Sequence, residues 1–252
     1  MDKIVAVIPA RMASSRFPGK PLKPILGLSM VEHVRRRVSL CPQVNKVIVA
    51  TCDREIVEEV ERFGGEAVMT SDRHEHCSDR VAEVAEVLDA EIIINVQGDM
   101  PLIRPETLEP LVAPLVQDKD LVCTDMMGAI EDDSEFINPN VVKVVVDTSK
   151  YALYYSREPI PSLKKAPSGY DMPRYKQFGV IAFRRDFLIK FAGLPKTPLE
   201  RIESVDMLRA LEHGYKIRMV STLYPVVGVD TQEDLELATE FMKKDPLLSR
   251  YN

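Results

Sequence analysis

The chain alternates between short, unbroken apolar runs and longer stretches in which apolar residues recur with a helical period. Residues 4–8 and 91–96 are runs rich in isoleucine and valine, which is typical of strands buried on both faces. Residues 54–63 instead carry one apolar stripe, follow a potential N-cap at Asp53 and end at two glycines. This alternation predicts βαβ units and an α/β fold of three layers around a mostly parallel sheet.

The same pattern predicts the bounds of the other elements. Ser29 followed by Glu32 fits a capping box that opens a helix through about residue 39. From about residue 120 the pattern changes to two strand-like runs close together, followed by a proline-rich segment at 159–173, which predicts a β-rich insertion within a single domain of 1–252. The remaining predicted strands are 46–51, 66–70, 141–147, 152–156, 178–183 and 216–221, and the remaining helices are 78–89, 199–212 and 231–243.

The amino-acid composition argues against several classes of protein. The 252 residues carry 33 Lys and Arg against 39 Asp and Glu, a formal net charge of −6, which argues against a nucleic-acid platform. No run approaches the roughly 18 consecutive apolar residues that span a bilayer, and the amino terminus has no cleavage-like small-residue site. The four cysteines form no C-x-x-C pair and are typical of free thiols. We therefore expect a cytoplasmic protein with neither nucleic acid nor membrane as partner.

A loop rich in cations and hydroxyls follows the first predicted strand. Ligands of open α/β sheets bind at the carboxyl ends of strands, and this loop begins at such an end. Guanidinium and ammonium groups beside the backbone N–H groups of a small-residue turn suit a polyphosphate. The alternative is a solvated surface loop with incidental charges. The polar side chains of the loop are Arg11, Ser14, Ser15, Arg16 and Lys20.

Two acidic residues follow other apolar runs, which we expect to be strands. Gln97, Gly98 and Asp99 come after the run at 91–96, and Asp230 follows the apolar stretch 226–229. Each is weak evidence alone, because Gly-Asp is common turn chemistry and an acid beside a helix N-terminus is favoured electrostatically. Together they suit Mg²⁺, which typically takes one or two carboxylates and completes its shell with water and substrate phosphates. The sequence thus predicts a metal site opposite a phosphate-binding loop.

Three motifs, PARMASSRFPGKPL, NVQGDMP and GVDTQEDL, together resemble the 3-deoxy-manno-octulosonate (Kdo) cytidylyltransferases, also called CMP-Kdo synthetases. The likeness continues through GGEAVMTSD, NPNVVKVVVD, YALYYSREPIP and PLERIESVDMLR in the family's order. The resemblance implies a Rossmann-like nucleotide-diphospho-sugar transferase fold and a homodimer. Residues 1–120 would bind the nucleotide, 121–185 the acceptor and the second subunit, and 186–252 would complete the core.

The reaction implied by the resemblance joins CTP to the anomeric hydroxyl of a 2-keto-3-deoxy sugar acid and releases pyrophosphate, for lipopolysaccharide or capsule assembly. By the same resemblance, Arg11 and Lys20 hold the CTP phosphates, while Asp99 and Asp230 bind Mg²⁺; these four are the expected catalytic residues. Whether Asp99 receives the acceptor's proton, directly or through a metal-bound water, or a second metal lowers the pKa of the sugar hydroxyl, stays open. The residues expected at the nucleotide are Ala10, Arg11, Ser14, Lys20, Arg80 and Gln97, and those at the acceptor are Gln97, Arg157, Gln177 and Glu203.

Most residues that differ from the family's usual motifs are at positions that the resemblance places near the acceptor. HCSDR at 76–80 stands where the family usually reads SGTDR, and Met100 stands at a usual glutamate. Gln177 and Ile181 occupy the usual histidine and tyrosine positions of a segment that lines the acceptor pocket. A site built to hydrogen-bond a substrate discriminates strongly, so such changes favour a modified ulosonic acid; neutral drift around an unchanged Kdo pocket is the alternative.

Two other functions are compatible with the residues. One is a cytidylyltransferase for a different anionic acceptor, such as a phosphonate or a sugar 1-phosphate. The other is a catalytically silent CTP-binding homologue. Elsewhere the arginines at 35–37 suggest a solvated helix face, and the His74-x-His76 pair suggests a polar loop.

Overall fold

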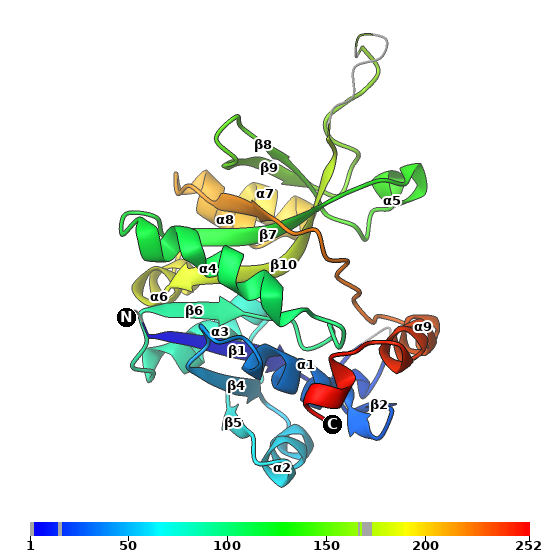
Figure 1. Cartoon of the computed structure of the whole chain (residues 1–252). Coiled ribbons are helices and arrows are strands. Elements are labelled where there is room, and N and C mark those ends of the chain that lie inside the picture. The colour runs from blue at the N-terminus through cyan, green and yellow to red at the C-terminus, as the bar shows by residue number, and fades with distance from the viewer. Residues whose placement is uncertain (1–2, 15–16, 166, 168–172) are drawn as a thin grey trace.

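The computed structural model describes residues 3–14, 17–165, 167 and 173–252. Within these residues nine strands form one mixed sheet (Figure 1). The order β5-β4-β1-β6 is parallel throughout, β10 runs antiparallel to β6 and β7, and β11 is parallel to β7. The expected α/β fold with a mostly parallel sheet is therefore confirmed. The strands along this path are β11 (Arg218–Ser221), β7 (Cys123–Ala129), β10 (Tyr175–Arg184), β6 (Ile92–Asn95), β1 (Ile4–Ala10), β4 (Lys46–Thr51) and β5 (Glu66–Met69).

A hairpin extends the sheet beyond β10. Strands β8 (Lys143–Val146) and β9 (Ala152–Ser156) pair antiparallel, and β8 also pairs with the start of β10. This is the predicted β-rich segment, seen at the top of Figure 1. A separate two-stranded ribbon joins β2 (Pro24–Ile25) and β3 (Leu28–Ser29).

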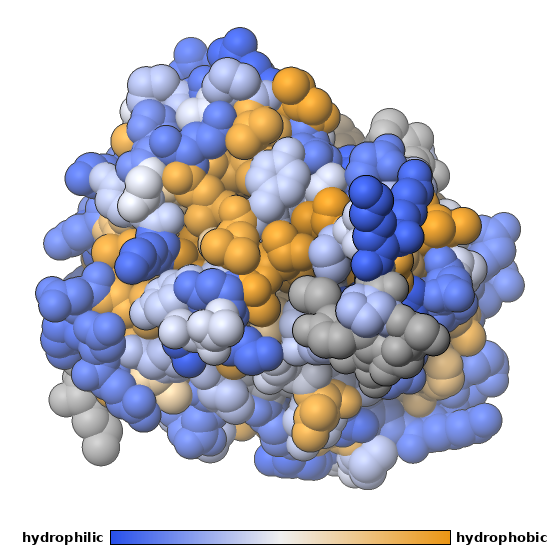
Figure 2. Space-filling view, turned by 90° about the horizontal axis from the view of Figure 1, so that it is seen from above, coloured by the Kyte–Doolittle hydropathy of each residue, from blue (hydrophilic) through white to orange (hydrophobic). Residues whose placement is uncertain are grey.

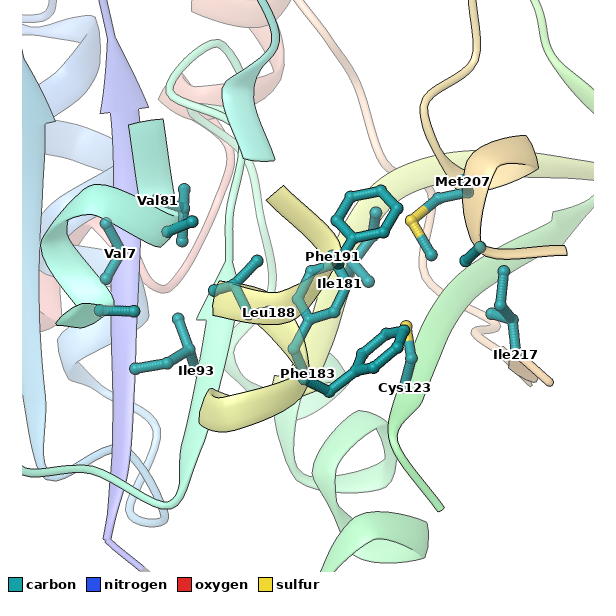
Figure 3. Packing of buried hydrophobic residues seen from close by; sticks show 14 of the residues in the cluster. Val7, Val81, Ile93, Cys123, Ile181, Phe183, Leu188, Phe191, Met207 and Ile217 are labelled. Carbon is teal, nitrogen blue, oxygen red and sulfur yellow. The ribbon is translucent and has the colours of Figure 1, made fainter. Parts of the chain in front are cut away.

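Helices cover both faces of the sheet because its strands are apolar on both sides. One face packs against α3 (Cys77–Glu86) and α6 (Arg185–Ala192), with Val7 and Ile93 of the sheet meeting Val81 and Leu188 (Figure 3). The other face packs against α1 (Met30–Ser39), α2 (Arg54–Arg62) and α4 (Leu108–Gln117). These two cores give the three predicted layers. No helix in the described part of the chain is long and apolar enough to cross a membrane.

The last helix, α9 (Gln232–Lys243), lies beside the loop that follows β1 (Figure 1). Leu235, Ala238 and Met242 of this helix form a third buried cluster with Phe17 and Val229. The chain end is fastened to α1, where the buried Arg37 donates to Asp245 at 2.7 Å. The prediction of a solvated face for the arginines at 35–37 is thus wrong for Arg37, because an acid distant in the sequence pairs with it.

The predicted helix over 199–212 is broken in two. The structure has α7 (Pro198–Glu203) and α8 (Met207–Glu212), separated at Ser204, whose φ of 54° is left-handed. The tertiary contacts of both halves outweigh the continuous helical pattern. Pattern analysis also left out β7, α4 and α6, since polar residues such as Asp125 interrupt the apolar run of β7. The remaining short helices are α5 (Asp133–Ile137), η1 (Lys20–Leu22), η2 (Pro105–Thr107) and η3 (Leu248–Arg250).

Two predicted helix caps have other roles. Ser29 precedes α1, but its hydroxyl makes no capping bond, and Glu32 instead binds the side chains of Arg35 and Arg36. The carboxylate of Asp53 does not cap α2 either. It accepts a hydrogen bond from the backbone N–H of Met12 at 2.7 Å, which fastens the loop after β1 to the end of β4.

Candidate active site

The cationic loop is a tight turn at the carboxyl end of β1. The carbonyl of Met12 accepts bonds from the N–H groups of Ser14 at 2.9 Å and Gly19 at 3.1 Å. Gly19 has a φ of +69°, a left-handed conformation that glycine adopts without strain, and it starts the 3₁₀ turn η1 at Lys20. Ser15 and Arg16 lie outside the described residues. The turn therefore aims Lys20 back across the strand ends.

Lys20 lies between the two predicted metal-binding carboxylates. Its Nζ is 2.7 Å from Oδ2 of Asp99 and 3.0 Å from Oδ1 of Asp230. The lysine side chain is 13% exposed, against 30% and 42% for the two acids. Burial by itself would lower the pKa of Lys20, but the charges and hydrogen bonds of Asp99 and Asp230 raise it above its usual value. The ammonium is thus held charged, and the two carboxylates share one small region.

Backbone contacts bring Asp99 and Asp230 together across more than half the chain. Gly98 passes so close to β1 that a Cβ there would lie 2.9 Å from the carbonyl oxygen of Pro9. The carbonyl of Asp99 then accepts a bond from the N–H of Val229 at 2.9 Å. The expectation that Asp230 follows a strand is wrong, since β11 ends at Ser221 and the segment before Asp230 is irregular.

Two adjoining cavities lie beside these groups. The larger, of about 340 Å³, has Lys20, Asp99 and Asp230 in its wall, and the smaller, of about 60 Å³, reaches Arg80. Both are bounded by Pro9, Ala10, Arg11 and Cys77. The larger cavity is also lined by Ala13, Ser14, Pro21, Gln97 and Gly98, and the smaller by His74, Glu75 and His76.

The other residues predicted at the nucleotide are held firmly. Arg80 is buried in α3 and donates to the hydroxyl of Thr70 and, at 3.5 Å, to the thiol of Cys52. Gln97 donates through Nε2 to the carbonyl of Gly179 at 3.0 Å. Gly179, with a φ of +72°, lies where the pairing register of β10 with β7 shifts. A bulge of β10 thus contacts Gln97, which lines the larger cavity.

Arg157 and Glu203, both predicted at the acceptor, contact each other in the structure. The Glu203 carboxylate accepts from the backbone N–H of Arg157 and from the hydroxyls of Ser156 and Tyr154, at 2.8, 2.8 and 3.1 Å. The guanidinium of Arg157 donates to the Glu203 carbonyl at 2.6 Å. Burial raises and these hydrogen bonds lower the pKa of Glu203, with a net shift downward. The pair fastens β9 to α7, and a contact of either residue with the acceptor stays a prediction.

A buried polar cluster behind Gln177 was missed in the sequence. Asp125 is fully buried in β7, and its Oδ2 accepts from Nε2 of Gln177 at 2.7 Å and from the Tyr155 hydroxyl at 2.9 Å. Burial raises the pKa of Asp125 to about 8, although these two hydrogen bonds lower it, and the nearby Asp206 raises it further. The signal in the sequence was a lone acid inside the run LVCTDMM.

The family of this chain follows from comparison with known proteins. A family model described as cytidylyltransferase matches residues 5–217. The chain therefore belongs to the cytidylyltransferase family, and the fold described above is the one that its solved relatives have.

The more similar relatives, at 40% identity or above, are named for one activity. A protein of Geotalea uraniireducens called 3-deoxy-manno-octulosonate cytidylyltransferase is 46% identical over 250 residues, covering 96% of this chain and 100% of the relative. One of the same name from Syntrophotalea carbinolica is 47% identical over 238 residues, covering 92% and 95%. A structure of CMP:2-keto-3-deoxy-manno-octonic acid synthetase complexed with CTP superposes with a TM-score of 0.90 at 40% identity, covering 96% and 99%. A 4-diphosphocytidyl-2C-methyl-D-erythritol synthase of Anaerococcus prevotii, 15% identical with a TM-score of 0.62 and coverage of 96% of both chains, shares the fold alone.

Proposed function

We propose that this protein transfers the cytidylyl group of CTP to the anomeric hydroxyl of Kdo or a closely related ulosonic acid, with release of pyrophosphate. The observation that carries the proposal is the position of Lys20 between Asp99 and Asp230 in the wall of the cavity that Arg11 also lines. The names of the relatives favour this acceptor class over a phosphonate or a sugar 1-phosphate, and CTP in the solved one favours CTP as the nucleotide.

The transfer of the cytidylyl group requires positive charges that are positioned at the phosphates before the reaction. When the sugar hydroxyl oxygen bonds to the α-phosphorus, the bond to pyrophosphate breaks and charge grows on the phosphate oxygens. In our proposal Arg11 and Lys20 neutralise that charge, and Ser14, which lines the larger cavity, helps to seat the nucleotide. The buried Arg80 forms the wall of the smaller cavity and gives the nucleotide a rigid boundary.

The two carboxylates suit a magnesium ion. Asp99 and Asp230 supply hard oxygen ligands, both partly exposed, and their oxygens already lie within 3.0 Å of one cationic nitrogen. Among the described residues no cluster of three or more His, Cys, Asp or Glu forms a protein-only metal site. Mg²⁺ commonly uses one or two carboxylates with water and substrate phosphates, and when bound it would neutralise phosphate charge. We include Mg²⁺ in the proposed function on this donor set.

A pyrophosphate-release assay tests the proposed function. Purified protein is given each of the four nucleoside triphosphates with a panel of ulosonic acids, with Mg²⁺ or with EDTA. We expect pyrophosphate only when CTP, Kdo or a related ulosonic acid, and Mg²⁺ are all present. Release with phosphonates or sugar 1-phosphates alone, or no release with any acid despite CTP binding, would contradict the proposal and favour one of the other two functions.

The hairpin side of the molecule supports a proposal of homodimer formation. Viewed from above, on the side where Figure 1 draws β8, β9 and α7, apolar side chains gather in one area (Figure 2). Leu153 of β9 is 60% exposed and Ile202 of α7 is 78% exposed. Contiguous exposed apolar surface of this kind is typical of interaction sites. We include a dimer through this side in the proposed function.

Charges on this surface should separate the subunits. The double variant Leu153→Glu/Ile202→Glu is expected to be a monomer at micromolar concentration, where the wild type is a dimer, because each buried charge would lack a partner. Light scattering coupled to size-exclusion chromatography measures the mass. Leu237→Glu, at a 50% exposed position on α9, is the matched control and should stay dimeric. A monomeric wild type would refute the dimer.

A further inference from the structure

Asp125 is a buried acid that the proposed chemistry does not use. Its Oδ1 has no hydrogen-bond partner among the described residues, and its Oδ2 accepts from both Gln177 and Tyr155. Leaving a buried polar atom unpaired is costly, so an acid retained here has some use that an apolar residue would not serve. The residue directly across the ladder on β10 is Ile181, which is fully apolar and buried.

The cluster is linked to residues of the cavity wall on two sides. Asp206, whose charge acts on Asp125, accepts from the hydroxyl of Ser78 at 2.6 Å, and the neighbouring Cys77 lines the cavity. On the other side, Gln177 stands two residues before Gly179, whose carbonyl holds the cavity residue Gln97. Gln177 itself is half-buried. It therefore lies between the buried acid and the part of β10 that contacts Gln97.

The hydrogen bond to Asp125 determines the orientation of the Gln177 side-chain amide. An amide has a donor end, its nitrogen, and an acceptor end, its carbonyl oxygen. In the structure Oδ2 of Asp125 accepts from the Gln177 nitrogen as well as from Tyr155, so the donor end of the amide faces Asp125. The Gln177 carbonyl oxygen is at the other end of the amide and makes no hydrogen bond with the described residues.

We propose that Asp125 is a positioning residue for acceptor selection: it holds the Gln177 amide nitrogen inward, so that the Gln177 carbonyl oxygen meets a hydrogen-bond donor of the sugar acid. The inference rests on the proposed function. It specifies the acceptor by chemistry, as an ulosonic acid that carries a hydroxyl or an ammonium at the position facing Gln177. An acceptor with only a carbonyl or ether oxygen there is disfavoured, because two acceptors would face each other.

Steady-state kinetics on a small set of variants tests this inference. Asp125→Leu and Gln177→Leu should each raise the KM for the acceptor by about tenfold, the cost typical of one lost hydrogen bond, while the KM for CTP stays the same. The double variant should be no worse than Gln177→Leu alone, because Asp125 acts through Gln177. Asp125→Asn keeps an oxygen that accepts from Gln177 and should restore the wild-type KM.

The preference among acceptor analogues is a second measurement, which a general structural defect would not change selectively. With Kdo analogues that each lack one hydroxyl, the wild type should have a raised KM for one of them, and this preference should disappear in both leucine variants. Tyr155→Phe removes the other hydrogen bond to Asp125 and is the control: it should lower the thermal midpoint and leave the preference intact. If Asp125→Leu does not fold, Asp125→Val, which likewise has no acceptor, replaces it in every comparison.

The outcomes separate the inference from the proposed function. No pyrophosphate from the wild-type protein with any ulosonic acid overturns the function. Turnover by the wild type, with an unchanged acceptor KM in the folded Asp125 variant, overturns the inference alone. Additive effects of the two substitutions, or equal rises in the KM for CTP and for the acceptor, also overturn it, because both outcomes indicate a general structural role.

Discussion

Replacing Asp99 by asparagine is expected to lower kcat by about 10²–10³, the range typical of losing one preorganised electrostatic group in a transition state. Asp99 provides an oxygen 2.7 Å from the Lys20 ammonium, and its backbone carbonyl binds the segment that carries Asp230. The substitution keeps the size of the side chain and removes its charge. We therefore expect the loss in turnover and in Mg²⁺ dependence, measured by pyrophosphate release over a magnesium titration, with the thermal midpoint near that of the wild type.

A matched substitution separates charge at the site from charge in general. Asp89 pairs with Lys3 at 2.9 Å, at the opposite, amino-terminal end of β1, and its carboxylate is 96% exposed. Asp89→Asn should turn over at the wild-type rate. Equal kcat for Asp99→Asn and the wild type at limiting Mg²⁺ would show that Asp99 holds no catalytic ion, and the site assignment would fail while the family membership would stand.

Replacing Arg209 by leucine is expected to reduce the free energy of unfolding by about 3–5 kcal/mol, the usual cost of breaking a buried ion pair from one side. Arg209 of α8 binds both oxygens of Glu200 of α7, at 2.9 and 2.6 Å, and both side chains are 1% exposed. Burial by itself would raise the pKa of Glu200, but Arg209 lowers it below the usual value. The substitution leaves a carboxylate buried without its cation. Urea unfolding at neutral pH, followed by circular dichroism, measures the loss.

Two further variants test whether the unpaired buried charge causes that loss of stability. Glu200→Leu/Arg209→Leu removes both charges and should be less destabilised than Arg209→Leu, because no unpaired ion remains. Lys243→Ala removes an exposed partner of Glu240 on α9 and should leave the urea midpoint unchanged. A single variant as stable as the wild type would mean that solvent reaches Glu200 and that the pair contributes nothing to the fold.

The sequence was most informative where one strand and the turn after it carry the signal. The apolar run of β1 followed by Pro9 and a cationic turn predicted both a buried strand and the place of Lys20, since strand periodicity and turn chemistry are local properties. Asp99 followed in the same way from its place after β6. The motifs also identified the family that the comparisons show.

The sequence pattern gave wrong predictions where a residue distant in the sequence determines the local structure. The helical pattern breaks at Ser204, where contacts distant from the local pattern hold both halves: Glu203 fastens α7 to β9, and Arg209 of α8 folds back onto Glu200 of α7. The sequence around Arg37 is typical of an exposed helix face. Arg37 is buried only because residues near the end of the chain pack against α1 and bring Asp245 to it. No local pattern contains such a pairing.

By itself the sequence determined the succession of strands and helices, the loop of cations and the family, because each depends on residues close together in the chain. Only the tertiary structure decided that Asp230, outside any strand, lies against the same ammonium as Asp99, and that Asp125 lies behind Gln177. The physical reason is that the position of a charge depends on which chain segments pack side by side. That packing is set by buried surfaces contributed from the whole chain.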